Sequence, residues 1–562
     1  EFRRRGLGIY ATIKGDEKPT PFIEDPAIDP KYLADYTLEV LELCKSMDVD
    51  VVFYGHASVG VIHTRPLLNL KSAEGIEKYA KISQATFELV KKYGGSWSGE
   101  HGDGLIRSYQ NKNLFGEKIY DDFLKLKKAF DPNNLFNPGK IVNAPAMTES
   151  LRYGSEYKTK DIKTYFDFSK DEGFAAAIEM CSGVGACRKT DAGTMCPSFM
   201  ATRDEEHSTR GRANILREAI SGKLPGGLAS QEVYEAMELC LECKACKAEC
   251  PSQVDMAKIK YEFLQQYYDQ HGRPLTAKIF GYVYKTAPYG RFMAPIANLV
   301  LPTKPFRWLL QVLFKVDSRR MMPLYANRTF KQWLEQNRAK LLEQVKENDK
   351  KTVALYVDTW TMYHVPHLGE AAIKVLEAFD YKVEIIPYSC CGRTLISKGL
   401  IKDAKKQATS TRDLLHKYWA RGISVVGLEP SCVASFQDDY LDLIPSDKTV
   451  EVSKNVLMIE QFLTKEWVAG KIDPSQVFDK NKADLLLHGH CQQKAVMGTA
   501  ASQAVLEWVS DQVDNLDAGC CGMAGSFGYS HYDVSMKIGE DRLFPAVREH
   551  DGEVAALGFS CR

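Results

Sequence analysis

The sequence predicts a multidomain protein of the α+β and α/β classes, and three observations carry that prediction. At 562 residues, the chain exceeds the size at which a single hydrophobic core stops growing. Two cysteine-rich runs interrupt an otherwise helical pattern between residues 173 and 275. Residues 351–562 carry an internal repeat in which strand patterns alternate with helix patterns. We therefore expect a mixed domain, a helical cysteine-rich domain and tandem α/β repeats.

The expected boundaries follow shifts in composition. Residues 1–145 alternate short apolar runs with amphipathic segments such as 72–94, and they close on the turn-rich DPNNLFNPGKIV. The next stretch is polar and aperiodic, which is typical of a linker. The chain is then expected to divide into a linker at 146–172, a cysteine-rich domain at 173–275, a helical connector at 276–346, and repeats at 347–480 and 481–562.

Composition excludes several classes of protein. The hydrophobic fraction of 44% and the charged fraction of 26% are those of a soluble globular protein. Basic and acidic residues balance at 73 each, so no net positive field favours nucleic acid. No run reaches the 18 or so apolar residues of a membrane span. The opening EFRRRGLGIY has neither methionine nor an apolar signal core, so it is expected to be an internal point of a longer protein.

Cysteine usage indicates metal sites in a reducing compartment. Fourteen of the 15 cysteines follow residue 180, mostly in tight clusters. Clustered C-x-x-C runs in a large chain are typical of metal sites, whereas disulfide frameworks belong to small secreted domains. Cysteines bind metals as thiolates, and a reducing compartment keeps them from forming disulfides. We therefore expect a cytoplasmic protein.

A histidine and carboxylate constellation falls in the first 145 residues. VDVVFYGHASVGVIH predicts a hairpin in which Ala57–Gly60 form the loop and His56 pairs with Val61. His63 then becomes the diagonal neighbour of His56 on the same face, within reach of a shared ion. Glu100 and His101 follow in the glycine-flanked SGEHGDG. Two histidines and a carboxylate match a catalytic zinc-type site, and the alternative is a set of hydrogen-bonded structural side chains.

The motifs GH-x3-G-x2-H, SGEHG and DPNNLFNPGK together resemble the C-terminal half of FAD-linked oxidases of the vanillyl-alcohol oxidase superfamily. Within it, the chain is most similar to bacterial D-lactate and D-2-hydroxyglutarate dehydrogenases fused to iron–sulfur domains. The resemblance implies a substrate (cap) domain in which His56, His63 and Glu100 hold a divalent metal, Zn or Mn, and His101 is the catalytic base. Arg65, just after the second histidine, is expected to bind a substrate carboxylate or to pair with a structural acid.

The same resemblance sets expectations for the flavin. In that family the FAD pyrophosphate lies in an N-terminal domain, and of this chain only the NPGK segment, with Asn137 and Lys140, would face the flavin. The sequence has no G-x-G-x-x-G after a strand and no P-loop. We therefore expect an N-terminal FAD-binding region or subunit as a partner. The implied reaction oxidises a D-2-hydroxyacid to the 2-oxoacid, with hydride passing to FAD.

Two cysteine runs predict a ferredoxin-like domain. Cys240, Cys243, Cys246 and Cys250 follow the C-x2-C-x2-C-x3-C-P pattern of a [4Fe-4S] cluster, for which zinc is the alternative. The earlier run supplies Cys181, Cys187 and Cys196. In two-cluster ferredoxins the fourth cysteine of each run serves the other cluster. Cys196 should therefore join the later run, and Cys250 should join the earlier one.

The earlier run lacks one ligand, because Val184 occupies the second C-x2-C position. Three thiolates suit a [3Fe-4S] cluster, as in the related run of succinate dehydrogenase iron–sulfur subunits, which it resembles. A four-iron cluster completed by another group, or loss of this cluster, is the alternative.

The C-terminal repeats each carry a Cys-Cys-Gly. The first copy offers Cys390, Cys391 and Cys432, and the second offers Cys491, Cys520, Cys521 and Cys561. The spacing from the first paired cysteine to the lone cysteine is 42 residues in one copy and 41 in the other. The repeats resemble the cysteine-rich domain of heterodisulfide reductases and of glycolate and glycerol-3-phosphate dehydrogenase iron–sulfur subunits. Both a cluster and a structural role remain open, and the second copy is the better candidate for a cluster.

Residues 291–316 mix bulky apolar residues with Arg291, Lys304, Arg307 and Lys315. They predict either a packed helix or a helix on a bilayer surface, which would place the protein peripherally on the inner face of the membrane. The leading function is an oxidoreductase that passes electrons through iron–sulfur clusters to quinone or another carrier. The alternatives are an electron-transfer subunit without its own dehydrogenase activity, and a zinc-binding scaffold.

Overall fold

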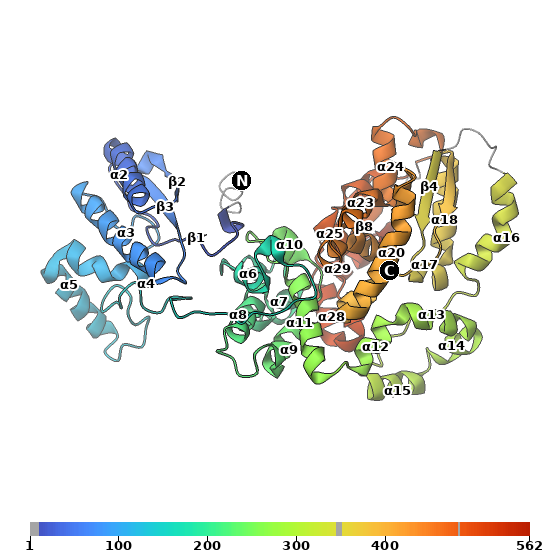
Figure 1. Ribbon diagram of the computed structural model, residues 1–562, viewed down its shortest axis with the longest axis horizontal. Coiled ribbons are helices and arrows are strands. Elements are labelled where there is room, and N and C mark those ends of the chain that lie inside the picture. The colour runs from blue at the N-terminus through green and yellow to red at the C-terminus, as the bar shows by residue number, and fades with distance from the viewer. Residues whose placement is uncertain (1–9, 344–350, 481–483, 517) are drawn as a thin grey trace. The chain divides into compact units, whose positions relative to one another are not determined.

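A computed structural model describes residues 10–343, 351–480, 484–516 and 518–562 of the chain. The chain forms two compact units, residues 1–159 and 160–562 (Figure 1). The first unit contains an antiparallel sheet, and the second contains two parallel sheets among many helices. This mixture is the α and β composition that the sequence predicted. In the described residues, no helix is long and apolar enough to cross a membrane.

The first unit packs helices against a small sheet of order β1-β3-β2. The strands are β1 (Lys18–Pro19), β2 (Val51–His56) and β3 (Val61–Leu68). The helices are α2 (Leu33–Ser46), α3 (Ala73–Lys92), α4 (Gly104–Arg107) and α5 (Asn111–Phe130). Along α3 the residues Tyr79, Ile82, Phe87 and Val90 are buried, which is the spacing of one helix face. That face joins Trp97 in the core of the unit.

The β2–β3 hairpin confirms the predicted register. His56 pairs with Val61, and a single 3-10 turn at Ala57–Val59 joins the strands. Gly60 ends that turn with φ +71°, and a Cβ there would lie 1.7 Å from the carbonyl oxygen of Ile28. Only glycine meets both demands, because this conformation is strained for other residues and the backbone leaves no room. The turn therefore fixes the direction in which His56 and His63 point.

The second unit begins with a helical part that surrounds the cysteine runs. Its helices are α6 (Phe174–Glu179), α7 (Pro197–Thr202), α8 (Thr209–Ile220), α9 (Gln231–Glu238), α10 (Ala245–Glu249) and α11 (Met256–His271). Residues just before α6 have linker-like composition, yet Phe166 and Phe168 are buried in this core. The buried carboxylate of Glu262 on α11 accepts the backbone N–H groups of Tyr165 and Phe166, each at 2.9 Å. That part of the expected linker is therefore packed.

A set of helices connects the cysteine runs to the α/β part. They are α12 (Leu275–Gly281), α13 (Val283–Phe292), α14 (Ala294–Val300), α15 (Lys304–Phe314) and α16 (Phe330–Glu343). Figure 1 shows α13, α14 and α15 at the edge of the second unit, away from its sheets. The last of these helices ends at Glu343, and residues 344–346 of the expected connector lie outside the described residues.

The α/β part contains two parallel sheets that share one topology. The first has the order β5-β4-β6-β7 and the second β10-β8-β9. In both, the first strand in sequence lies between the second and the third. The strands are β4 (Lys351–Tyr356), β5 (Tyr381–Ile385), β6 (Ser424–Gly427), β7 (Val456–Met458), β8 (Leu485–His488), β9 (Val513–Asn515) and β10 (Glu553–Ala556). This shared order is the structural counterpart of the repeated sequence pattern.

Helices follow the strands at corresponding places in the two sheets. In the first copy they are α17 (Thr359–Tyr363), α18 (Pro366–Ala378), α19 (Arg393–Ser397), α20 (Ile401–Trp419), α21 (Pro430–Ala434), α22 (Tyr440–Leu443), α23 (Asp447–Asn455) and α24 (Ile459–Val468). In the second they are α25 (Cys491–Val496), α26 (Ala500–Leu506), α27 (Phe527–Ser530), α28 (Tyr532–Asp541) and α29 (Leu543–Glu549). Every cysteine of this part follows the carboxyl end of a strand, the edge at which open α/β sheets bind ligands.

Candidate functional site

The three expected metal ligands converge beside the β2–β3 hairpin. His56 ends β2, His63 lies within β3, and Glu100 lies in the loop before α4. The Nε2 atom of His56 is 3.5 Å from Glu100 Oε1, and the Nε2 atom of His63 is 3.6 Å from Glu100 Oε2. The three donor atoms all lie within 4.8 Å of one another. Two imidazoles and one carboxylate at this spacing suit a divalent metal that keeps positions open for a substrate.

His63 is held in the tautomer that a metal requires. Its side chain is fully buried, and Nδ1 lies 2.5 Å from the backbone carbonyl oxygen of Glu24, to which it donates. Nε2 is buried and has no hydrogen-bond partner among the described residues. Burial lowers the pKa of His63, so the ring stays neutral and Nε2 keeps its lone pair. A buried, unpartnered imidazole nitrogen aimed at a carboxylate is well suited to metal binding.

His101 lies against the same set. Its ring stacks on the ring of His63 with centroids 5.3 Å apart, and its Nε2 atom is 3.5 Å from Glu100 Oε2. Its Nδ1 atom is 3.6 Å from Glu24 Oε1. The His101 side chain is 44% exposed, whereas that of His63 is fully buried. Glu24, His63 and His101 therefore form a second donor set that shares His63 with the first.

Glu24 and Asp25 are site residues that the sequence reasoning missed. The carboxylate of Asp25 is fully buried and accepts the backbone N–H groups of Glu100 at 2.6 Å and His101 at 2.7 Å. It also pairs with the buried guanidinium of Arg107, which donates to the carbonyl oxygen of Gly102. Burial alone would raise the pKa of Asp25, but these N–H groups and Arg107 hold it below its usual value. Asp25 thus anchors the loop that carries Glu100 and His101.

Asp25→Ala is expected to destabilise the first unit by about 3–5 kcal/mol, because it leaves Arg107 buried without its partner. Since folding depresses the pKa of Asp25, its contribution is present above about pH 4 and is lost as the pH falls further. Denaturant unfolding at two pH values measures both effects. Asp122→Ala, which removes an exposed partner of Lys125 on α5, is the matched control, with an expected change within about 0.5 kcal/mol. Equal effects of the two substitutions would contradict the anchoring role.

Arg65 pairs with an acid of the site. Its Nη2 atom donates to Glu24 Oε1 at 2.8 Å and to the hydroxyl of Tyr54 at 2.7 Å. The pairing with a structural acid, one of the two expectations for Arg65, is therefore present. Tyr54 in turn stacks on His63 with ring centroids 4.7 Å apart. Arg65 lies close enough to the donor set for a role in substrate binding to stay a prediction.

Asn137 and Lys140 lie in an exposed segment after α5. Lys140 Nζ donates to Asn137 Oδ1 at 3.1 Å, so the two side chains are neighbours. Asp131 shapes the segment by accepting the backbone N–H groups of Leu135 and Phe136, each at 2.9 Å. The side chains of Leu135 and Phe136 are nevertheless 72% and 70% exposed. An exposed polar pair beside bare apolar side chains suits contact with a flavin and another domain.

Cys196 lies beside the later cysteine run. Cys196, Cys240, Cys243 and Cys246 line a common cavity in the second unit. All four thiols are buried, and Arg212 Nη1 donates to Cys196 Sγ at 3.5 Å. Burial raises the pKa of Cys243 and Cys246 well above the usual value, and neighbouring thiols add to the shift. Four buried thiols become stable thiolates only with a cationic centre among them, so the donor set suits a [4Fe-4S] cluster.

The earlier run gathers the remaining thiols of this part. Burial raises the pKa of Cys187, to which nearby Cys196 and Cys181 also contribute, and Cys250 is raised by burial and by Cys187. The backbone N–H of Arg210 donates to Cys187 Sγ at 3.4 Å, as commonly found around cluster sulfurs. Val184 is 63% exposed, so the position that should hold a fourth thiol is not buried with this set.

The two α/β copies place corresponding residues at the same strand ends. Cys520 and Cys521 of the second copy match Cys390 and Cys391 of the first, and Cys561 matches Cys432. The glycines after the pairs have φ +77° and +81°, and their N–H groups donate to Cys390 Sγ at 3.3 Å and Cys520 Sγ at 3.4 Å.

The copies differ at a fourth position. The helix after the first strand of each copy begins with Thr359 in the first copy and with Cys491 in the second. Thr359 is hydrogen-bonded to the Cys390 thiol, and Cys491 is hydrogen-bonded to the Cys520 thiol. That bond lowers the pKa of Cys491 to about 6. Cys521 and Cys561 also lie 3.6 Å apart, within a candidate donor set with His488. The second copy therefore offers four thiols where the first offers three.

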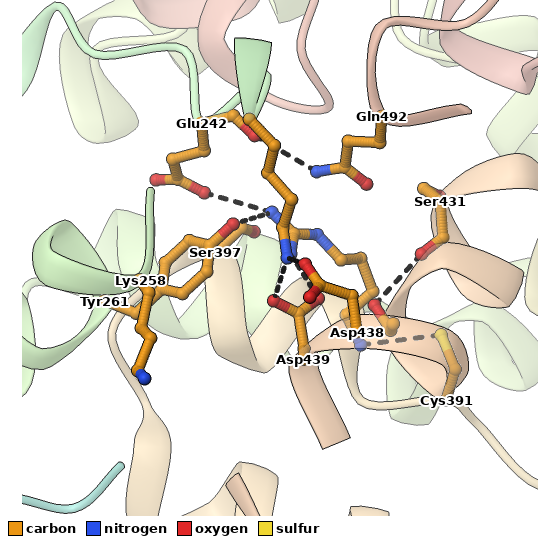
Figure 2. Close-up of polar contacts among 12 residues, drawn as sticks. Glu242, Lys258, Tyr261, Cys391, Ser397, Ser431, Asp438, Asp439 and Gln492 are labelled. Atoms are coloured by element: carbon orange, nitrogen blue, oxygen red, sulfur yellow. Dashed lines mark hydrogen bonds and ion pairs between the residues drawn. The ribbon is translucent and has the colours of Figure 1, made fainter. Parts of the chain in front are cut away.

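A buried polar network joins the ferredoxin-like run to the first copy (Figure 2). Glu242 stands between Cys240 and Cys243 in sequence, and Arg393 follows the first Cys-Cys-Gly. The Arg393 guanidinium lies 3.4 Å from Glu242 Oε2 and donates to Tyr261 Oη at 2.6 Å. Its backbone N–H donates to Cys391 Sγ at 3.5 Å. The two cysteine sites are thus connected through a few buried side chains.

The second copy adjoins both of these sites. The nearby Cys491 is the largest contributor after burial to the raised pKa of Cys243. Figure 2 shows Gln492 beside Glu242, and its Nε2 atom donates to the Glu242 carbonyl oxygen at 3.2 Å. A second contact joins the two α/β copies. Glu429, near Cys432 of the first copy, accepts the backbone N–H of Phe559, near Cys561 of the second, at 2.9 Å. The cysteine sites of the second unit form one contiguous series.

Two family models match the chain. The C-terminal domain of FAD linked oxidases matches residues 1–141, and a 4Fe-4S dicluster domain matches residues 179–255. These ranges contain the histidine and carboxylate set and all seven cysteines of the two runs. Residues 1–141 and 179–255 therefore correspond to the FAD-oxidase and iron–sulfur domains that the motifs indicated.

Curated relatives extend the similarity to the whole chain. D-2-hydroxyglutarate dehydrogenase of Pseudomonas putida is 30% identical over 604 residues, covering 100% of this chain and 58% of the relative. The enzyme of the same name from Pantoea ananatis is 28% identical over 607 residues, with the same coverage of 100% and 58%. One subunit of the anaerobic glycerol-3-phosphate dehydrogenase of Escherichia coli is 28% identical over 268 residues, covering 46% of this chain and 65% of the subunit.

The chain thus spans about three fifths of the length of the D-2-hydroxyglutarate dehydrogenases that it matches, 58% in each case. Residues 1–141 are similar to the C-terminal domains of FAD linked oxidases and residues 179–255 to 4Fe-4S dicluster domains, and the resemblance to FAD-linked D-2-hydroxyacid dehydrogenases with iron–sulfur domains is confirmed.

Proposed function

We propose that this chain is the substrate-binding and electron-transfer part of an FAD- and iron–sulfur-dependent dehydrogenase. It oxidises a D-2-hydroxyacid, D-lactate or D-2-hydroxyglutarate, to the 2-oxoacid. One observation carries the proposal: a donor set with open positions, His56, His63 and Glu100, lies beside His101 in the chain that also carries the cluster thiols. Curated relatives named D-2-hydroxyglutarate dehydrogenase support the substrate class.

The side chains of the first unit divide the work of binding and proton transfer. When bound, the divalent metal acts as a Lewis acid on the substrate hydroxyl, and FAD accepts the hydride. His101 removes the hydroxyl proton, because it is partly exposed and lies 3.5 Å from Glu100. Glu24, 3.6 Å from His101 Nδ1, orients the ring and stabilises its protonated form. Arg65, whose Nη2 atom donates to Glu24 at 2.8 Å, binds the substrate carboxylate.

The flavin is held mainly outside this chain, by an FAD-binding region or subunit. Asn137 and Lys140 contribute from the exposed segment after α5. Electrons then pass to the [4Fe-4S] cluster of Cys196, Cys240, Cys243 and Cys246, and onward to quinone or another carrier. A peripheral membrane position suits a quinone acceptor.

The set Cys181, Cys187 and Cys250 holds a [3Fe-4S] cluster. It has three thiols, and the exposed Val184 supplies no donor atom. Oxidised protein is expected to show the electron paramagnetic resonance signal of an oxidised three-iron cluster. Val184→Cys should remove that signal only if the loop turns inward, so Cys187→Ser, which should abolish it, is the sharper variant. A full iron complement, counting any cluster of the second α/β copy, together with no such signal would contradict the assignment.

In the second α/β copy, Cys491, Cys520, Cys521 and Cys561 form a further cluster site, whereas the first copy, with Thr359 in the corresponding place, is structural. Iron and sulfide content of a Cys520→Ser variant tests this division, with Cys390→Ser as the matched change in the first copy. Loss of iron from the Cys390→Ser protein alone would reverse the assignment.

An electron-transfer subunit without its own dehydrogenase activity is the alternative. A match to one subunit of the anaerobic glycerol-3-phosphate dehydrogenase, which covers 46% of this chain, favours this alternative. Turnover separates the two functions: with a flavin-binding region supplied, D-2-hydroxyacids should reduce an artificial acceptor, and the rate should depend on metal. The alternative predicts reduction of the clusters by a partner but no oxidation of hydroxyacid.

A further inference from the structure

Helices α13–α15 expose bulky apolar side chains. Phe292, Leu299 and Trp308 are 82%, 75% and 62% exposed, and Ile296, Val312 and Leu313 are 58%, 59% and 57% exposed. We call these six residues the apolar surface. Helix α15, KPFRWLLQVLF, contains no buried residue at all. Phe306, Leu310 and Phe314 are half-buried, but most of the helix's apolar area is left exposed, so another apolar phase should cover it.

The charged residues of the segment that carries the apolar surface are all basic. Residues 270–316 contain seven lysines and arginines and no aspartate or glutamate, in a chain whose total charge is balanced. Lys278, Lys285, Lys304 and Lys315 are exposed, and none of them forms an ion pair with an acid among the described residues. The next acid in sequence, Asp317, is bonded to Arg319. The surface is therefore complementary to a negatively charged partner.

The apolar residues of α15 share one side of the helix. Trp308 and Val312 are four residues apart, as are Leu309 and Leu313, and all four are exposed. Lys304 precedes the helix's apolar run and Lys315 follows it, so the apolar side has a cation at each end. Apolar residues with Trp on one face and Lys or Arg at the margins are the pattern of a helix that lies in the bilayer interface. Figure 1 shows α14 and α15 at an outer edge of the second unit, free of its two sheets.

We propose that the apolar surface of α13–α15 docks on an anionic lipid bilayer, with the apolar side chains entering the acyl boundary and the lysines facing the lipid phosphates. The inference deepens the proposed transfer of electrons to a membrane-borne acceptor and rests on it for its purpose. Vesicle binding needs neither substrate nor flavin. A failure to bind therefore overturns the docking and leaves the dehydrogenase proposal untouched.

Co-sedimentation of the full chain with lipid vesicles tests the docking. Vesicles of phosphatidylcholine mixed with phosphatidylglycerol should carry the protein down at low salt. Partitioning should fall about tenfold or more with phosphatidylcholine alone or at high salt, because the lysines contribute through screened charge. The double variant Trp308→Glu/Leu313→Glu should lose about tenfold or more of the binding to anionic vesicles.

Val468→Glu is the matched control, because Val468 is 78% exposed at the end of α24 and lies outside the surface. It should sediment like the unchanged protein. Circular dichroism and iron content establish that each variant is folded. No sedimentation of the unchanged protein at low salt, or equal sedimentation of the double variant, overturns the proposal. So does a change of oligomeric state in the double variant without vesicle binding, which assigns the surface to a second copy of the chain.

Discussion

His63→Ala is expected to abolish bound divalent metal and nearly all turnover while the visible iron–sulfur absorbance persists. The side chain is fully buried, and Nδ1 is fixed on the Glu24 carbonyl oxygen, so Nε2 is the nitrogen left to bind the proposed ion. Loss of a supporting residue alone typically weakens metal binding by about 10–100-fold, and loss of a ligand should exceed this. Metal analysis after dialysis against a weak chelator measures the effect.

Thr64→Ala is the control for damage to β3. Thr64 is the next residue on the strand, is also fully buried, and points to the other face of the sheet. The Thr64→Ala protein should keep its metal. Full turnover by metal-free protein, or equal metal loss in both variants, would sink the assignment of His63.

His101→Ala is expected to keep its metal and to slow flavin reduction by about 10²–10⁴-fold, the usual effect of removing a general base. The ring is 44% exposed, and the substitution removes only its stacking on His63 and its contacts with Glu24 and Glu100, so the fold should be unaffected. Rapid mixing of substrate with the flavin-reconstituted protein measures the step. Partial recovery at higher pH, where substrate deprotonates more readily, would strengthen the case for a base.

The two donor sets share His63, and the metal content of His101→Ala and His56→Ala shows which of the two holds the ion. If the metal uses Glu24, His63 and His101, then His101→Ala loses metal and His56→Ala keeps it. If it uses His56, His63 and Glu100, the two variants behave in the opposite way. Fast flavin reduction by metal-loaded His101→Ala would make His101 a structural residue.

Local features of the site were predictable from the sequence. The hairpin register followed from a short glycine-containing turn between two strand patterns, and it brought His56 and His63 to one face. The cross-run cysteine arrangement followed from the spacing that ferredoxin motifs share, and Cys196 does line the cavity with the later run. Each of these depends on few residues close in sequence or on a fixed motif.

Contacts between distant segments were not predictable. Asp25 lies 75 and 76 positions from the N–H groups it accepts, and nothing in FIEDPAI marks its carboxylate as buried. Phe166 and Phe168 stand in a polar stretch, and their burial depends on helix α11, almost a hundred residues later. The correspondence of Thr359 with Cys491 needed the two sheets, because a threonine carries no motif. Burial of isolated residues is set by tertiary packing.

Electron flow from substrate to clusters is measured most directly by stopped-flow absorbance of the metal-loaded chain joined to a flavin-binding domain. D-2-hydroxyglutarate or D-lactate should bleach the flavin first and the iron–sulfur absorbance afterwards, and the L-enantiomer should leave both unchanged. His101→Ala should delay both phases together, because the clusters receive electrons only through the flavin. Protein whose clusters are bleached by dithionite but whose flavin stays oxidised with every D-2-hydroxyacid would contradict the dehydrogenase function.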